Sequence, residues 1–178
     1  MSASTSSSVP YVAVVGPGDV GPEEDAAAEA VGRLLAERGA VVVCGGLGGV
    51  MAAAARGARA GGGVSVGLLP GRDRAAANPY LSIALPTGMG QLRNGLVVAA
   101  ADAVIAVGGS WGTLSEVALA LRAGRPVVAL GGWRVAGGGP APVVPPGPVE
   151  ADSPEAAVTA ALSAATGTGT GPGRPGGS

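Results

Sequence analysis

The chain has 178 residues, of which 47% are hydrophobic and 13% are charged. This length fits one domain with a single core, and the composition is too apolar for a disordered chain. The formal net charge is −1, lysine and histidine are absent and cysteine occurs once. These facts exclude histidine metal sites, a Walker A phosphate loop, pyridoxal-phosphate enzymes with their Schiff-base lysine, and a disulfide framework.

The predicted elements alternate between short apolar runs and helix-like segments. The runs are rich in Val, Ile and Leu without polar alternation, which is typical of parallel strands buried on both faces. These predicted strands are residues 11–15, 40–44, 64–69, 81–85, 103–107 and 126–130. The predicted helices are residues 22–38, 49–60, 88–100, 112–123 and 153–165. The pattern predicts an α/β fold with a Rossmann-like open parallel sheet and helices on both faces.

The domain organisation follows from where Gly, Pro and Ser gather. Residues 10–165 are predicted to form one Rossmann-like nucleotide-binding domain, within which the Gly- and Pro-rich residues 131–150 are a long loop. Residues 1–9 are Ser-rich and residues 166–178 are Gly- and Pro-rich, and both are predicted to be disordered ends. The chain shows no secretory signal and no apolar run of membrane-spanning length, so we expect a cytoplasmic protein without a membrane partner.

Glycine-rich turns follow three of the predicted strands and lead into helices. In a parallel sheet these turns meet at the carboxyl edge, where glycine lets a ligand approach the backbone and helix N-terminal amides favour anions. We therefore predict phosphate binding at these turns, although glycine turns can also be purely structural. The predicted phosphate-binding residues are Gly16, Gly18, Gly45, Gly46, Gly48, Gly49, Gly108, Gly109, Ser110, Gly112 and Thr113.

The first turn also fits the dinucleotide-binding pattern, with glycines at Gly16, Gly18 and Gly21. That pattern requires an acidic residue for the ribose at the end of the second strand. Here the second strand ends in Cys44 and Gly45, without a carboxylate. The sequence therefore disfavours an NAD-dependent dehydrogenase.

Glu116 and Arg93 are the charged candidates for the site. Glu116 either completes a capping box with Thr113 as the N-cap, or places its carboxylate in the ligand crevice. Arg93 lies early in the predicted helix 88–100, where the helix dipole disfavours a cation, so it needs an anionic partner. That partner is either a bound phosphate or a protein carboxylate, for which Asp102 and Glu116 are the candidates.

Cys44 and Trp111 are weaker candidates beside the turns. Cys44 is the last residue of a predicted buried strand. We interpret it as a small hydrophobic core residue, and the alternative is a minor role in ligand binding. Trp111 either covers the base of a ligand or packs as a lid on the sheet.

Together these residues resemble the LOG family of cytokinin-activating phosphoribohydrolases, which are often misannotated as lysine decarboxylases. Residues 107–116 resemble the family's Pro-Gly-Gly-x-Gly-Thr-x-x-Glu motif, with Val107 in place of proline and with two residues, Ser110 and Trp111, where the motif has one. Residues 44–51 match its Gly-Gly-Gly-x-x-Gly-x-Met loop, with Cys44 in place of the first glycine. The resemblance covers roughly residues 11–131.

A third family motif, Met-x-x-Arg-Lys, is matched only loosely by the segment from Met89 to Asn94, in which Asn94 stands for the lysine. With these departures the sequence is more similar to a bacterial branch of the superfamily that is related to DprA proteins and molybdenum cofactor carriers. The resemblance implies that Glu116 and Arg93 are catalytic residues in an enzyme that splits the N-glycosidic bond of a nucleoside 5′-monophosphate. The alternative is a carrier or sensor that holds a phosphorylated ligand unchanged.

The expected partners follow from the same resemblance and from the charge. The ligand is a phosphorylated small molecule, such as a nucleoside monophosphate or molybdenum cofactor, and no cofactor or metal is expected to be required. The resemblance also implies a homodimer or larger homo-oligomer, with residues 88–100 as a contact. The near-neutral charge and the scarcity of aromatic residues disfavour nucleic-acid binding.

Overall fold

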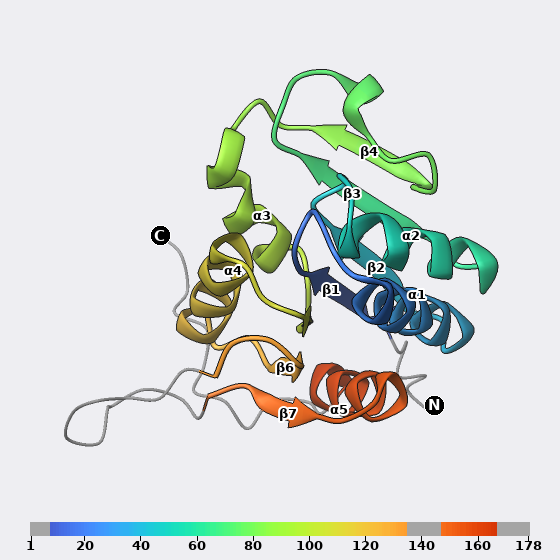
Figure 1. Cartoon of the computed structure of the whole chain (residues 1–178), viewed down its shortest axis with the longest axis vertical. Helices are drawn as coiled ribbons and strands as arrows, with labels where there is room; N and C mark the ends of the chain where they lie inside the picture. Colours follow the sequence, from blue (N-terminus) through green and yellow to red (C-terminus); the bar gives the residue numbers. More distant parts are fainter. Residues whose placement is uncertain (1–7, 135–146, 167–178) are drawn as a thin grey trace, which may run out of the picture.

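The computed structural model describes residues 8–134 and 147–166. Seven strands form one parallel sheet in the order β4-β3-β2-β1-β5-β6-β7, with β1 at its centre (Figure 1). The strands are β1 (Tyr11–Val15), β2 (Val41–Cys44), β3 (Ser65–Leu69), β4 (Ile83–Pro86), β5 (Ala103–Val107), β6 (Val127–Leu130) and β7 (Val149–Ala151). The predicted Rossmann-like α/β fold is confirmed, and each predicted strand is found to within a residue or two.

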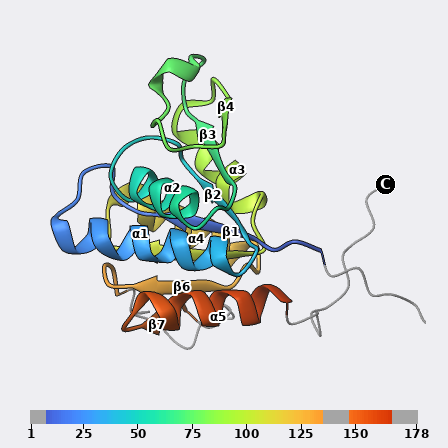
Figure 2. The same ribbon diagram turned by 90° about the vertical axis from the view of Figure 1, so that its right-hand side faces the viewer.

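Helices cover both faces of the sheet. The helices are α1 (Pro22–Glu37), α2 (Val50–Ala60), α3 (Asn94–Ala99), α4 (Trp111–Arg122) and α5 (Pro154–Thr166), with 3₁₀ turns η1 (Arg74–Ala76) and η2 (Gly90–Arg93). Figure 2 views the molecule from the side of α1, α2 and α5, while α3 and α4 lie behind the sheet. The sheet has a hydrophobic core on each face, and β1 contributes to both. Val12 and Val14 pack on the side of α1, α2 and α5, and Ala13 and Val15 pack on the side of α3 and α4.

The strand order creates a crevice beside β1. From β1 the chain moves outward through β2 and β3 to β4, and it then crosses back by α3 to place β5 on the other side of β1. Ligands in open α/β sheets bind at such a switch point, outside the carboxyl ends of the strands. The fold therefore predicts a ligand site at the turns after β1, β2 and β5.

Helices α1 and α2 approach each other closely because glycine stands at their crossing. A Cβ on Gly32 of α1 would overlap the backbone carbonyl of Ala54 in α2, and one on Gly57 of α2 would overlap the carbonyl of Glu29 in α1. Arg56 adds ion pairs to Asp25 at 2.6 Å and to Glu29 at 2.8 Å across the same interface.

Two predicted elements need correction. Residues 88–100 are not one helix but the turn η2 followed by the six-residue α3, because Gly88 and Gly90 have φ of +66° and +56°, outside the helical region. The predicted loop 131–150 ends in a strand, since β7 pairs in parallel with β6. The predicted ends, residues 1–9 and 166–178, lie outside the described residues except for residues 8 and 9 and for Thr166, which closes α5.

Candidate functional site

The three glycine-rich turns meet around one cavity at the carboxyl edge of the sheet. The cavity has a volume of about 290 Å³ and is bordered by the turns after β1, β2 and β5, by the first turns of α2 and α4, and by η2 with the start of α3. Its lining residues are Val15, Gly16, Gly18, Gly45, Leu47, Met51, Gln91, Arg93, Asn94, Ser110, Gly112, Thr113 and Glu116. Segments far apart in the sequence therefore contribute to a single site.

The predicted site residues divide into two groups. Those that line the cavity are Gly16, Gly18, Gly45, Arg93, Ser110, Gly112, Thr113 and Glu116. Those that the structure puts outside its lining are Gly46, Gly48, Gly49, Gly108 and Gly109. Backbone conformation accounts for glycine at Gly46, Gly49 and Gly108, whose φ values are +78°, +57° and +63°.

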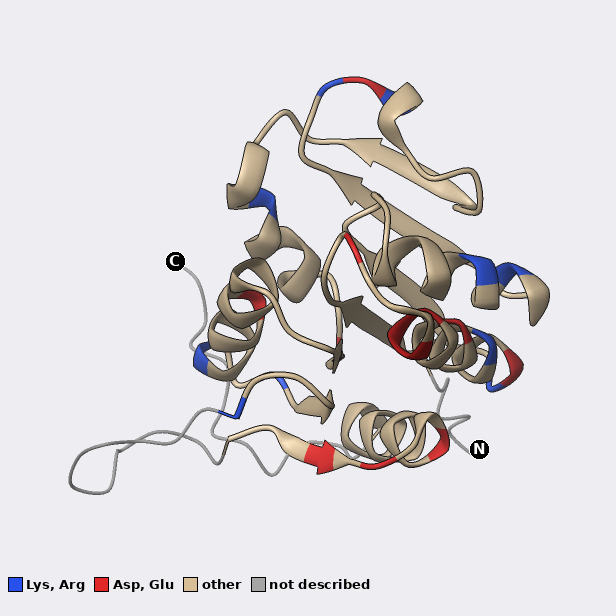
Figure 3. Ribbon diagram, in the orientation of Figure 1, with Lys and Arg blue, Asp and Glu red and all other residues tan. Residues whose placement is uncertain are grey.

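Helix α4, rather than α1, presents its N-terminus to the cavity. The first turn of α1 holds three acidic residues, which gather at its beginning in Figure 3, and Glu24 accepts a hydrogen bond from the Gly21 amide at 3.2 Å. This end is already capped by carboxylates and repels anions. In α4 the residues Ser110, Gly112 and Thr113 line the cavity instead, and the first turn has no acidic residue.

Of the two alternatives for Glu116, the structure does not show the capping box with Thr113 as N-cap. Helix α4 begins at Trp111, and its N-cap is Ser110, whose Oγ accepts a hydrogen bond from the Thr113 amide at 3.2 Å. Thr113 is therefore inside the first turn, and Glu116 lies one turn further along instead of reaching back to the cap. The Glu116 carboxylate is left for the cavity, which is the other of its two predicted positions.

Arg93 is a buried cation in the cavity lining. Only 5% of its surface is exposed, and Nη1 donates a hydrogen bond to Oδ1 of Asn94 at 2.9 Å. Its Nε is buried without a hydrogen-bond partner among the described residues. Burial lowers the pKa of Arg93, and the nearby Glu116 carboxylate acts in the opposite direction. A buried donor without an acceptor is rare in folded proteins and indicates a place for a ligand or water.

Glu116 is the carboxylate that faces Arg93. Its Oε1 lies 3.5 Å from Nη1 of Arg93, and 6% of the residue is exposed. Burial raises the pKa of Glu116 to about 7, and Arg93 offsets this only in part. Of the two carboxylates predicted as partners for Arg93, Glu116 is the one found, while Asp102 accepts a hydrogen bond from the Tyr11 amide at 2.9 Å.

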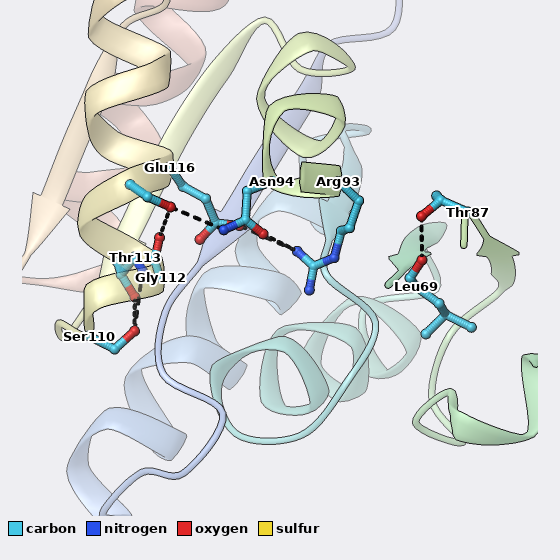
Figure 4. A network of polar contacts seen from close by, with 9 residues as sticks. Leu69, Thr87, Arg93, Asn94, Ser110, Gly112, Thr113 and Glu116 are labelled. Carbon is cyan, nitrogen blue, oxygen red and sulfur yellow. Dashed lines mark hydrogen bonds and ion pairs between the residues drawn. The ribbon is translucent and has the colours of Figure 1, made fainter. Parts of the chain in front are cut away.

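Asn94 connects Arg93 to helix α4. Its Nδ2 donates to the Ser115 Oγ at 3.1 Å, and that hydroxyl donates to the Gly112 carbonyl oxygen at 2.7 Å. Figure 4 shows Asn94 lying between the guanidinium of Arg93 and the first turns of α4. The position of the guanidinium is thus fixed relative to the N-terminus of α4.

Sequence reasoning missed several lining residues. They are Val15, Leu47, Met51, Gln91 and Asn94. Asn94 and Met51 had a signal, because both fall in the segments that resemble the LOG motifs. Leu47 and Gln91 lie in the same segments but at variable positions of the motifs, and Val15 lies in a strand, so for these three the sequence does not indicate a place in the site.

Cys44 lies just below the cavity. It is fully buried, its Sγ lies 3.8 Å from the Met51 carbonyl oxygen, and burial raises its pKa to about 11. Burial therefore favours the neutral thiol, which is the less reactive form of cysteine. This agrees with the interpretation of Cys44 as a small core residue.

Within residues 8–134 and 147–166, His, Cys, Asp and Glu side chains do not gather in a group that could hold a metal ion. Across the same residues, no helix combines the length and apolar character that crossing a membrane requires.

Sequence comparison assigns the chain to a family. The profile of the SLOG cluster4 family matches residues 9–146. The chain belongs to this family. SLOG proteins form the superfamily that includes LOG enzymes, DprA and molybdenum cofactor carriers, so the predicted resemblance is confirmed. An uncharacterized protein of Archaeoglobus fulgidus is 44% identical over 119 residues, which are 67% of this chain and 78% of the relative.

Solved structures similar to this SLOG protein include two molybdenum cofactor proteins. The molybdenum cofactor binding protein of Rippkaea orientalis superposes with a TM-score of 0.76 at 32% identity, over 86% of this chain and 96% of that one. The molybdenum cofactor carrier protein of Chlamydomonas reinhardtii superposes with a TM-score of 0.78 at 30% identity, over 90% of this chain and 99% of that one.

A more distant neighbour bears on the expectation about nucleic acid. DNA processing protein A of Helicobacter pylori, described as binding single-stranded DNA, gives a TM-score of 0.57 at 25% identity, over 68% of this chain and 65% of that one. Nucleic-acid binding thus occurs on this fold. In the SLOG chain the arginines are scattered over the described elements and do not form one basic stripe (Figure 3).

Proposed function

We propose that this SLOG protein binds a phosphorylated small molecule in the cavity and carries it chemically unchanged, and that molybdenum cofactor is the candidate cargo. One observation carries this proposal: a buried arginine with an unpartnered Nε lines the same cavity as the open N-terminus of α4. A guanidinium and helix N-terminal amides are the groups that proteins use for phosphate.

The donors for a phosphate come from both sides of the cavity. On one side Arg93 contributes its guanidinium, whose Nη1 donates to Asn94 and whose buried Nε has no partner among the described residues. On the other side helix geometry leaves the amides of Trp111 and Gly112 without an intrahelical acceptor. The hydroxyls of Ser110 and Thr113 lie 2.9 Å apart beside them and can turn a proton toward an anion.

The carrier reading draws on the neighbours as well as on the cavity. The Rippkaea and Chlamydomonas proteins are described as binding or carrying molybdenum cofactor, and this chain covers nearly their whole length. Carriage requires binding and release only, which the donors around Arg93 and α4 can supply without a nucleophile.

Identification of copurifying ligands tests the carrier function. The protein is purified from a host that makes molybdenum cofactor, and small molecules released by heat are identified by mass spectrometry. We expect a phosphorylated pterin in the wild type and in Arg122→Met, a matched control at the exposed far end of α4. We expect it to be lost in Arg93→Met. Absence of any phosphorylated compound, or equal recovery from Arg93→Met, would contradict the proposal.

A second candidate function is hydrolysis of the N-glycosidic bond of a nucleoside 5′-monophosphate. The observation that favours it is the position of Glu116, whose carboxylate lies in the cavity and has its pKa raised to about 7. A carboxylate beside the ribose can stabilise an oxocarbenium-like transition state or orient water, while Arg93 neutralises the phosphate.

Incubation with AMP and an assay for free base separates the enzyme from the carrier. The enzyme releases adenine and ribose 5-phosphate, and Glu116→Gln abolishes this turnover while AMP still binds. Saturable binding of AMP without release of base supports the carrier. Unchanged turnover in Glu116→Gln would reject the catalytic role of Glu116.

A further inference from the structure

We propose that Trp111 and Trp133 form a stacking surface for a planar heteroaromatic ring in the ligand whose phosphate occupies the cavity. This inference rests on the proposed function, because it adds a second contact to the same ligand. It narrows the ligand class from any phosphorylated molecule to ring-bearing monophosphates, such as a nucleoside monophosphate or a pterin monophosphate.

The two tryptophans are exposed although they are the largest apolar side chains in the protein. Trp111 is 77% exposed and Trp133 is 43% exposed. Their ring centroids lie 5.0 Å apart with an angle of 39° between the planes, within the range of aromatic pairs. They are also the only tryptophans in the chain. An exposed Trp that contributes little to a core calls for another role, and contact with a ligand or partner supplies one.

The pair is held in place on the third glycine-rich turn. The Trp133 Nε1 donates a hydrogen bond to the Ser110 carbonyl oxygen at 3.1 Å. Gly109 packs closely against the same indole, since a Cβ there would lie 2.5 Å from Cδ1 and 2.9 Å from Nε1. Trp133 therefore supports Trp111 from one side. Because Trp111 is already ordered, a ligand ring that stacks on it loses less binding free energy to side-chain ordering.

The tryptophans are joined to the rim of the cavity at Ser110, whose carbonyl oxygen accepts the Trp133 hydrogen bond, while Trp133 also borders a neighbouring cavity with Gly131, Gly132 and Arg134. Trp111 stands between Ser110 and Gly112, both of which line the cavity, while the tryptophans themselves lie outside its lining. The volume of about 290 Å³ is at the small end for ligand pockets, which commonly measure roughly 300 to 1,000 Å³. We infer that a nucleotide-sized molecule with its phosphate between Arg93 and α4 extends past Ser110 and Gly112, the lining residues that flank Trp111 in the chain.

Stacking on indole favours any flat aromatic ring, because it makes no hydrogen bonds to the polar groups at the edge of that ring. Every purine and pterin has a π face, so this contact tolerates different rings, whereas the phosphate donors demand an anion. The combination predicts that a sugar phosphate binds more weakly than a ring-bearing monophosphate with the same phosphate.

Calorimetric titrations with AMP, neopterin monophosphate and ribose 5-phosphate test the inference. We compare the wild type with Trp111→Ala, Trp111→Phe and Leu119→Ala, which removes another exposed apolar side chain of α4. In Trp111→Ala we expect the ring-bearing ligand to bind roughly 5- to 150-fold more weakly and ribose 5-phosphate to bind as before. Trp111→Phe retains most of the affinity, and Leu119→Ala retains all of it.

Tryptophan fluorescence gives an independent readout. Because both tryptophans belong to the proposed surface, stacking of AMP or neopterin monophosphate changes the emission of the wild type, and ribose 5-phosphate leaves it unchanged. Comparison of AMP with neopterin monophosphate distinguishes a nucleotide from a pterin as the source of the ring.

Three outcomes would overturn the stacking inference while the phosphate site stands. They are equal affinity of the wild type for ring-bearing and ring-free ligands, an equal loss for all ligands in Trp111→Ala, and an effect of Trp111→Ala on self-association alone. If none of the phosphorylated ligands binds the wild type, or if binding does not depend on Arg93, the proposed function itself fails.

Discussion

Arg93 and Glu116 are neighbours in the cavity without being joined by a hydrogen bond. The Arg93 Nη1 lies 3.5 Å from Oε1 of Glu116, whereas hydrogen-bonded ion pairs of this kind measure about 2.7 to 2.9 Å. Nη1 instead donates to Asn94. An incoming anion can therefore reach the guanidinium without first breaking a bond to Glu116.

Glu116→Gln should change how stability depends on pH. The folded-state pKa of Glu116 is raised to about 7 by burial, above its ordinary value of 4.5, so the fold favours the neutral carboxyl. This contribution to stability is fully present below pH 4.5 and is lost as the pH rises to 7, by about 3 kcal/mol at most. Glutamine stays neutral throughout, so the free energy of unfolding of the variant should rise relative to that of the wild type between pH 4.5 and 7.

Urea unfolding of both proteins between pH 4 and pH 8 measures this gain. The values near pH 4 serve as the internal control, because there the wild-type carboxyl is protonated and resembles glutamine. A constant difference between the two proteins over the whole range would contradict a raised pKa for Glu116.

Gly45→Ala should displace Arg93 and weaken phosphate binding. A Cβ at Gly45 would lie 2.7 Å from Nη1 of Arg93 and 2.6 Å from Sδ of Met51, closer than real Cβ atoms approach such neighbours. The φ of Gly45 is outside the glycine-favouring region, so the substitution tests space and not backbone strain. We expect binding of ribose 5-phosphate to weaken roughly tenfold or more, because a charge-assisted contact is lost.

The matched control is Gly21→Ala, since a Cβ at Gly21 meets nothing within 4 Å and its φ is −77°. Calorimetry should show unchanged affinity in this control. If Gly45→Ala binds ribose 5-phosphate as tightly as the control does, Arg93 either moves freely or does not hold the phosphate.

The sequence predicted the sheet and the meeting of the glycine turns, for a physical reason. Parallel strands buried on both faces appear as uninterrupted apolar runs, and the carboxyl ends of such strands must share an edge. The edge strand β7 escaped prediction because it has three residues with Glu150 in the middle and gains its order from pairing with β6.

The details of the site were less predictable than its location. Ser110 and Thr113 are both good N-caps, and only the folded turn decides that Ser110 takes the cap and leaves Glu116 free for the cavity. Asn94 likewise owes its role to Arg93 and Ser115, which a sequence pattern does not bring together. Local patterns located the site, and contacts between α3 and α4 arranged it.

Gly32→Ala should destabilise the fold through the α1–α2 crossing. A Cβ there would overlap the carbonyl group of Ala54, whose carbonyl carbon would be only 2.8 Å away. Both backbones are fixed by their own helical hydrogen bonds, so relief requires the helices to separate. We expect a loss of about 1 to 3 kcal/mol in the free energy of unfolding.

Gly95→Ala is the control for helix propensity, because a Cβ at Gly95 in α3 meets nothing within 4 Å. This control should be neutral or more stable, as alanine is the better helix former. Equal stability of Gly32→Ala and Gly95→Ala in urea unfolding would mean that α1 and α2 are not packed as closely as described.

Leu92→Asp should weaken self-association if the homo-oligomer implied by the LOG resemblance uses residues 88–100. Leu92 is 79% exposed, and Met89 and Leu96 of the same segment are 43% and 38% exposed, next to an edge strand, β4, with Ile83 47% exposed. Several exposed apolar side chains within one segment are typical of association surfaces. A buried aspartate would oppose association, because its charge loses water without gaining a partner.

Sedimentation velocity measures the outcome across a range of protein concentrations. We expect the wild type to sediment as a dimer or larger species and Leu92→Asp to shift toward the monomer. Leu119→Asp, on the exposed side of α4 and outside residues 88–100, is the control and should sediment as the wild type does. A monomeric wild type, or a Leu92→Asp variant that stays associated, would rule out this segment as the contact.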